Sequence, residues 1–213
     1  MLPATVVTVA RRGRPPGVDS ADTRERIIDA ARSEFAERGY AAASITSIAT
    51  RADLAPSAIY HYFGGKSELY EAVFSATADV IWHRLHEDLD EHTTFTDAVN
   101  HLLDASMTFT PEETAYNVFL AMIPTESRLH PQFSHLLTAR SKYQDAAFGG
   151  IVDLGLTTGE LVDIDRDVAI EMVRAAIMGS FFERHFRPEL TKVSVRAVRQ
   201  LLLSMTDGDR HHS

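Results

Sequence analysis

Side chains able to hydrogen-bond to a nucleic acid are concentrated in one short stretch of this chain, residues 44–66. The stretch contains serine and threonine hydroxyls, tyrosine phenols, an imidazole and, at its end, an ammonium group. Hydroxyl and imidazole groups bind base edges or phosphates, and an ammonium group binds phosphate oxygens through its charge. This set of groups predicts recognition of DNA, if the backbone places them on one exposed face.

Two short helices joined by a turn would provide that face. Ser44 is a favourable N-cap for the first helix, and residues 51–54 would form the turn. The second helix begins with Pro56 near its first position, where the missing N–H costs nothing. Its apolar residues Ile59 and Phe63 are four apart and would face the core. This arrangement, with a polar outer face on the second helix, is the one that enters a major groove.

The residues on this outer face are expected to contact either base edges or the phosphate backbone. We predict that base edges are contacted by Pro56, Ser57, Ala58, Tyr60 and His61, with Thr46 reaching a base from the first helix. We predict that Ser44, Tyr62 and Lys66 hold the phosphate backbone.

A longer set of residues at fixed spacing surrounds the two helices. It consists of Phe35, Gly39, Tyr40, Ser44, Ile45, Ile48, Ala49, Ile59, Tyr60, His61, Tyr62, Phe63, Lys66 and Leu69. In these positions, between about residues 21 and 72, the chain resembles the N-terminal domain of the TetR family of bacterial transcriptional regulators. Two positions depart from the family pattern: Asp53 replaces a turn glycine, and Ala55 replaces a capping serine.

The resemblance implies an all-α homodimer of about nine helices per chain. Two helix-turn-helix domains would bind successive major grooves of a palindromic operator, and a small apolar or amphipathic effector would release this cytoplasmic repressor. The implied division is a flexible basic arm (1–20), a DNA-binding domain (21–66), a ligand-binding and dimerisation domain (67–206) and a disordered tail (207–213). Alternatives are a ligand-independent DNA-binding module and a metal- or pH-responsive regulator using His83 and His86.

The first twenty residues contain the basic segment Arg11-Arg12-Gly13-Arg14-Pro15. Extended segments of this type fit a narrow A·T minor groove, so we predict that Arg11, Arg12 and Arg14 bind DNA. The alternative is a solvated tail that adds only non-specific attraction.

The distribution of charge along the chain is consistent with a DNA-binding part that precedes residue 67. The net charge is −9, but residues 1–66 carry nine Lys and Arg against seven Asp and Glu, whereas residues 67–213 carry twelve against twenty-three. An acidic second part would repel DNA and favour contact through the first. The chain has no cysteine, no apolar run of about 18 residues and no signal-peptide pattern, so we expect neither disulfides nor a membrane partner.

The helices expected after residue 67 are longer. Pro124 would close one that starts near residue 111, and Gly149-Gly150 would kink or interrupt one that starts near residue 131. Residues 168–186 are apolar on nearly all sides, which indicates burial both in the subunit and against a partner. The predicted dimer contacts are Ile170, Val173, Ile177, Phe181, Val195, Val198 and Leu202. The alternative is a helix central to a monomer.

Aromatic and methionine residues of the central helices are numerous enough to line a cavity for an apolar ligand. The predicted lining is Trp82, His86, Met107, Phe109, Phe119, Met122, Phe133, Tyr143, Phe148 and Met178. The alternative for each residue is ordinary core packing.

The sequence gives only weak evidence for a metal site or a catalytic site. His83 and His86 are three apart on a predicted helix, a spacing compatible with one metal ion, but ten histidines make such a coincidence easy. Asp163 and Asp165 are better explained as helix caps. The sequence has no nucleophile elbow, no glycine-rich phosphate loop and no H-E-x-x-H motif. We therefore expect no metal, no cofactor and no enzymatic activity.

Overall fold

The computed structural model describes residues 18–90, 93–108 and 110–206, without the side chains of residues 18–19, 82–90 and 111. All regular elements in these ranges are helical, which confirms the predicted all-α fold with about nine α-helices. The α-helices are α1 (Val18–Ala42), α2 (Ile45–Arg51), α3 (Pro56–Phe63), α4 (Lys66–Asp90), α5 (Phe95–Ala105), α6 (Pro111–Leu129), α7 (Ser134–Thr158), α8 (Arg166–Phe186) and α9 (Thr191–Leu203). Short 3-10 turns follow at Ser106–Thr108, Pro131–Phe133, Pro188–Leu190 and Ser204–Thr206.

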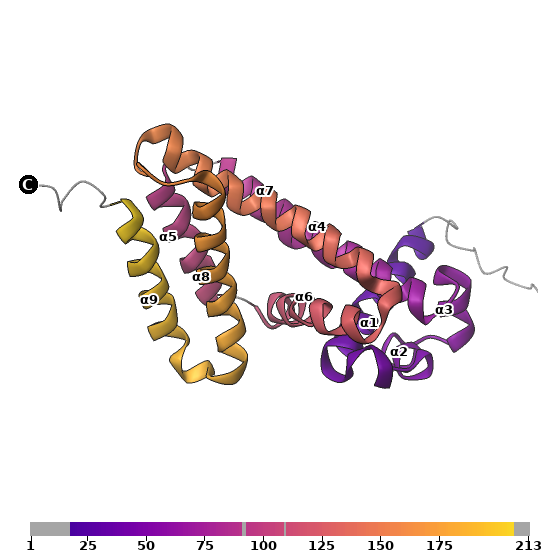
Figure 1. Cartoon of the computed structure of the whole chain (residues 1–213). Helices are drawn as coiled ribbons and strands as arrows, with labels where there is room; N and C mark the ends of the chain where they lie inside the picture. The colour runs from indigo at the N-terminus through magenta and orange to yellow at the C-terminus, as the bar shows by residue number, and fades with distance from the viewer. Residues whose placement is uncertain (1–17, 91–92, 109, 207–213) are drawn as a thin grey trace, which may run out of the picture.

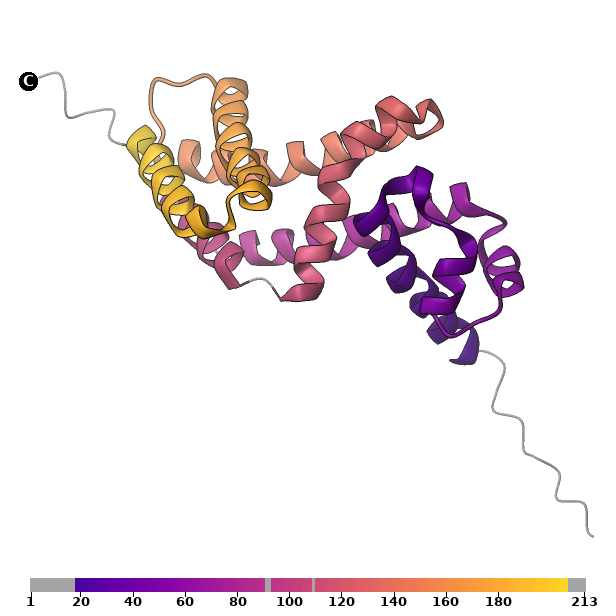
Figure 2. The ribbon, with the colours of Figure 1, turned by 90° about the horizontal axis from the view of Figure 1, so that it is seen from below.

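The helices form two groups at opposite ends of an elongated molecule. Figure 1 shows α1, α2 and α3 at one end and α5, α8 and α9 at the other. The long helices α4 and α7 run side by side between the two ends, and α6 crosses the space between them, as the view from below also shows (Figure 2). α6 packs on α1, α4 and α7, so it belongs to the end that carries α3.

Two hydrophobic cores correspond to the two ends. The first contains buried residues of α1 to α4, of α6 and of the beginning of α7, including Phe35, Tyr70 and Phe119. The second joins α5, the rest of α7, α8 and α9 through residues such as Phe95 and Ile177. The first core therefore extends well beyond the predicted DNA-binding domain of residues 21–66. None of the helices in the described ranges combines the length and apolar character needed to cross a lipid bilayer.

Two predicted helix interruptions are wrong. Pro124 lies inside α6, which continues to Leu129. Proline removes one helical hydrogen bond, but α6 is held on either side of it by the buried Ile123 and by Ser127, whose hydroxyl donates to the Phe133 carbonyl at 3.1 Å. Gly149 lies inside an uninterrupted α7, where a Cβ atom would come within 3.2 Å of the Arg166 guanidinium. This glycine serves the close approach of α7 to the start of α8.

The first helix, α1, is interrupted by non-helical backbone at Gly39 and resumes after it. Gly39 has φ 73° and ψ 169°, a conformation that essentially only glycine adopts. A Cβ atom there would lie 2.7 Å from Oε1 of Glu126 on α6. Gly39 therefore both bends the chain and admits a carboxylate from a helix far along the sequence.

We predict that Gly39→Ala lowers the free energy of unfolding by about 1–3 kcal/mol, because alanine is strained at this φ and its methyl group meets Glu126. Urea denaturation monitored by circular dichroism would measure the loss. In a Glu126→Ala background the same substitution should cost less, since only the backbone strain remains. An equal loss in both backgrounds would contradict the steric part of this explanation.

Candidate nucleic-acid interface

Local sequence signals set the bounds of α2 and α3. The Ser44 hydroxyl accepts a hydrogen bond from the Ser47 N–H at 3.0 Å and so caps α2. Asp53 adopts a left-handed conformation (φ 55°) in the turn, in agreement with its replacing a glycine there. Ala55 forms no side-chain cap, and α3 starts at Pro56 and ends at Gly64, whose φ is 86°. The predicted start of α2 and the bounds of α3 are therefore those of the structure, whereas the turn begins one residue later than predicted, at Ala52.

Basic side chains fix this turn against α1. Arg26 donates to the backbone carbonyl of Ala52 at 2.6 Å. The Arg51 guanidinium donates to both carboxylate oxygens of Glu37, at 2.8 and 2.7 Å, and this hydrogen bonding holds the pKa of Glu37 below its ordinary value. A bidentate pair of this kind defines orientation as well as distance. Sequence analysis did not find these contacts, which position the turn that leads into α3.

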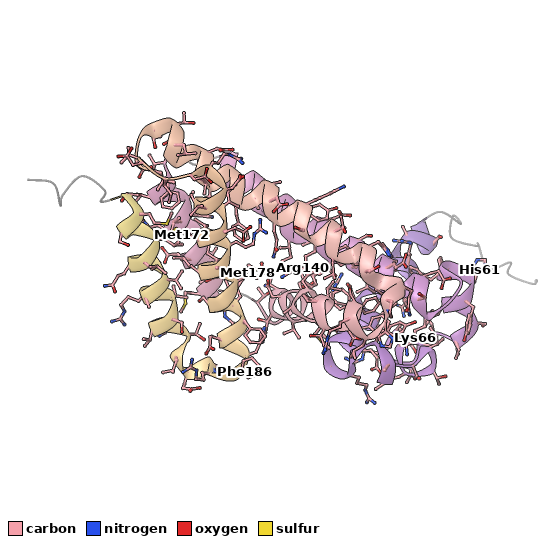
Figure 3. The ribbon with its side chains drawn as sticks, in the orientation of Figure 1. His61, Lys66, Arg140, Met172, Met178 and Phe186 are labelled. Carbon is pink, nitrogen blue, oxygen red and sulfur yellow. The ribbon has the colours of Figure 1, made fainter. Side chains whose placement is uncertain are left out.

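The predicted base-reading residues lie on an exposed surface. Thr46, Pro56, Ser57 and His61 are exposed, and 56% of the Tyr60 surface is accessible. Figure 3 shows His61 at the end of the molecule farthest from α8 and α9. These side chains make α3 the most accessible candidate for insertion into a groove.

Three other predicted contacts are less accessible. Ala58 and Tyr62 are half-buried, and Tyr62 packs against the first core. Nζ of Lys66 lies 4.5 Å from the centre of the Tyr40 ring and donates to the carbonyl of Ala41 at 3.2 Å, and burial lowers the pKa of Lys66. Its ammonium group thus secures the start of α4 to the end of α1. The predicted arm contacts Arg11, Arg12 and Arg14 lie outside the described residues.

A buried carboxylate connects this end of the molecule to α6. Glu126 is 6% exposed, and its Oε1 accepts a hydrogen bond from the backbone N–H of Tyr40 at 2.9 Å. Its Oε2 lies 3.5 Å from Nε2 of His130. The rings of Tyr40, Tyr70 and Phe133 pack on one another beside it, with centroids 4.6 to 5.2 Å apart. No local signal could reveal this link, because its two partners are 86 residues apart.

The predicted lining of one ligand pocket is divided between the two cores. Phe119, Phe133 and Tyr143 belong to the first core, whereas Phe148, Met107 and Met178 belong to the second. Met122 is half-buried on α6, and the side chains of Trp82, His86 and Phe109 lie outside the described residues. The described members therefore pack in two separate cores, and their role as a ligand-pocket lining stays a prediction.

The predicted dimer contacts are also mostly internal. Ile170, Val173, Ile177, Val195 and Leu202 are buried in the core of their own subunit, and Phe181 and Val198 are half-buried against it. These side chains therefore leave little surface for a partner. The large apolar residues exposed on α8, α9 and the turn between them are Val168, Met172, Phe182, Phe186, Leu190, Val193 and Leu201. The exposed residues are thus better candidates for a partner contact than the predicted ones, and the dimer contact itself stays a prediction.

In the part of the chain that the structure describes, no three His, Asp or Glu side chains are grouped as metal ligands. Asp165 caps α8 by accepting from the Asp167 and Val168 N–H groups, as predicted, while Asp163 adopts a left-handed conformation before it. The side chains of His83 and His86 lie outside the described residues, so the metal alternative remains a hypothesis.

Comparisons with known proteins agree with this geometry. Residues 27–73 match the sequence profile described as "Bacterial regulatory proteins, tetR family". The chain is 25% identical to the HTH-type transcriptional repressor KstR2 of Mycolicibacterium smegmatis over 198 residues, which cover 90% of this chain and 95% of that protein. It is 27% identical to the transcriptional regulator UidR of Escherichia coli K12 over 119 residues, 56% of this chain and 59% of UidR.

Solved structures share the fold. Salmonella enterica GusR superposes with a TM-score of 0.71 at 22% identity, covering 92% of this chain and all of GusR. FadR from Bacillus subtilis, in complex with stearoyl-CoA, superposes with a TM-score of 0.67 at 23% identity, covering 85% of this chain and 98% of FadR.

Together, the fold and the exposed α3 define a helix-turn-helix DNA-binding protein. Residues 27–73 match the DNA-binding domain of the TetR family of bacterial regulatory proteins, and the two relatives named above are transcriptional regulators.

We predict that Tyr60→Ala and His61→Ala each weaken operator binding by about 1–3 kcal/mol without changing stability, because both side chains are exposed. Fluorescence anisotropy on a selected operator would measure the change. His135→Ala removes an exposed imidazole from α7 and is the matched control, for which operator affinity should stay at the wild-type value. Equal losses for His61→Ala and His135→Ala would contradict the assignment of α3.

Proposed function

We propose that this regulator is a homodimeric repressor that binds a palindromic operator and is released by a small amphipathic ligand. The observation that carries the proposal is the separation of two surfaces: a polar reading face on α3 at one end and an exposed apolar face on α8 and α9 at the other. Pairing of two subunits through the apolar face would leave both α3 helices accessible. Two such helices about 34 Å apart would read successive major grooves.

The exposed apolar side chains of α8 and the turn after it supply the proposed subunit contact. Met172, Phe182 and Phe186 are 41%, 57% and 66% exposed, and the rings of Phe182 and Phe186 are 4.9 Å apart. Figure 3 shows Met172 and Phe186 toward opposite ends of α8, so the apolar surface extends along the helix. Gly179 lies between them with open space over its Cα, which would permit a partner helix to approach closely.

Control by a ligand requires a connection from the second part of the chain to α3. Two helices could provide it. α4 continues from helices α1 to α3, the reading head, toward α5, α8 and α9, and α6 contacts the end of α1 through Glu126. A ligand that prefers a conformation with displaced α4 or α6 would change the spacing of the two α3 helices. The stearoyl-CoA bound by Bacillus subtilis FadR supports an amphipathic ligand as the class to test first.

The proposed domain division places the arm in residues 1–20, the DNA-binding domain in 21–66 and the ligand-binding and dimerisation domain in 67–206. Selection of random DNA duplexes on the full chain, and on a chain lacking residues 1–18, tests the DNA part. We expect two inverted half-sites from the full chain and loss of flanking A·T preference from the shortened one. Salt-sensitive binding without an enriched sequence would contradict the proposed function.

We predict that Phe186→Glu converts the dimer into monomers and weakens operator binding at least tenfold, because the introduced charge would lose its hydration in the subunit contact. Analytical ultracentrifugation would measure the oligomeric state. Leu129→Glu is the matched control, since Leu129 is an apolar residue of α6 with 60% exposure. Dissociation by Leu129→Glu but not by Phe186→Glu would place the subunit contact elsewhere.

A further inference from the structure

A half-buried arginine that pairs with none of the carboxylates in the described part of the chain lies where α7 meets α8. One guanidinium nitrogen of Arg140 donates to Oε1 of Gln144 at 3.2 Å, and another lies 3.9 Å from the sulfur of Met178. Figure 3 shows Arg140 and Met178 beside each other on the inner side of the two helices. Among the side chains that the structure describes, no carboxylate is within ion-pair distance of Arg140.

Two arginines of α8 differ from Arg140 in this respect. Arg174 pairs with Asp145, and Arg166 pairs with Asp153 at 2.7 Å. Burial lowers the pKa of Arg140, and the charge of Arg174 lowers it further. An arginine remains protonated in proteins even when it is buried. The cost of removing this charge from water is therefore not offset by the described part of the chain.

Two hydrogen-bond donors converge at this position on one weak acceptor. The Gln144 side-chain amide donates to the Met178 sulfur at 3.1 Å, and the Arg140 guanidinium points to the same atom. A thioether sulfur is a weak acceptor, whereas a carboxylate or phosphate oxygen accepts strongly from both groups. The arrangement of a cation and an amide is thus more suitable for an oxyanion than for the sulfur that it contacts.

We infer that Arg140 and Gln144 bind the anionic group, a carboxylate or phosphate, of an amphipathic effector. The apolar part of the effector lies along Met178 and Phe181, which are one turn apart on α8 and both half-buried. This inference rests on the proposed control by a small ligand, and it further specifies that the ligand is negatively charged. The anion replaces a weak contact with a paired charge, so binding selects the conformation in which α7 presents both donors beside Met178 of α8.

Isothermal titration calorimetry with three probes of equal chain length tests the inference on the full chain. The probes are dodecanoate and dodecyl phosphate below their micellar concentrations, and dodecanol below its solubility limit. We expect at least one anion to bind about 30-fold or more tightly than dodecanol, which is the factor for losing one buried charge-assisted contact. The anion that binds more tightly identifies the carboxylate or the phosphate as the natural group.

Variants then assign the binding to Arg140. Arg140→Met should remove the preference for the anion while retaining dodecanol binding, and Lys142→Met, which removes an exposed cation from the same helix, should leave the preference unchanged. Equal binding of all three probes to the wild type, binding of neither anion, or an unchanged preference in Arg140→Met would overturn the inference.

Operator binding by the unliganded Arg140→Met variant should equal that of the wild type, which shows that the variant is folded. Failure to select any operator contradicts the proposed function but leaves the calorimetric result intact. The two failures are therefore distinguishable.

Discussion

The burial of one carboxylate, that of Glu126, constrains the relative positions of three helices. The carboxylate on α6 accepts the N–H of Tyr40 at the bend of α1, and the ammonium of Lys66, at the start of α4, is attracted to it across the Tyr40 ring. A buried charge that loses its partners is strongly destabilising. Any displacement of α6 must therefore carry α1 with it or break this contact, which couples the reading head to the body of the molecule.

The parts of the fold that the sequence predicted depend on local chemistry. Ser44 caps α2, Pro56 starts α3 and Gly64 ends it, and each residue acts through neighbours within one helical turn. The contacts that fix these helices on α1 were not predictable in this way. Glu37 and Arg51 are 14 residues apart, and Glu126 and Tyr40 are 86 apart, so only the packed chain brings them together.

The candidate ligand and dimer residues illustrate a second limit of sequence analysis. A helix that is apolar on nearly all sides must be covered on two sides, but its periodicity does not say which side faces the subunit's own core. Ile177 and Phe182 have equal apolar character in the sequence, yet the first is buried and the second is 57% exposed. Likewise, Phe119 and Phe148 are both central aromatics that serve different cores. Arg140 was overlooked because an isolated arginine has no distinctive sequence context.

The first core extends into α6 and the beginning of α7. This limits where domains can be exchanged between this protein and its relatives. A fragment ending at residue 66 would leave Phe35 without Tyr70 and Phe119, whose rings lie 4.9 and 6.5 Å from it. Exchange of the α1–α3 region between relatives at that boundary would produce chimeras with an incomplete interior. A functional exchange must include the surface of α6 that faces α1, so the helix-turn-helix region and the adjoining α6 are inherited as one unit.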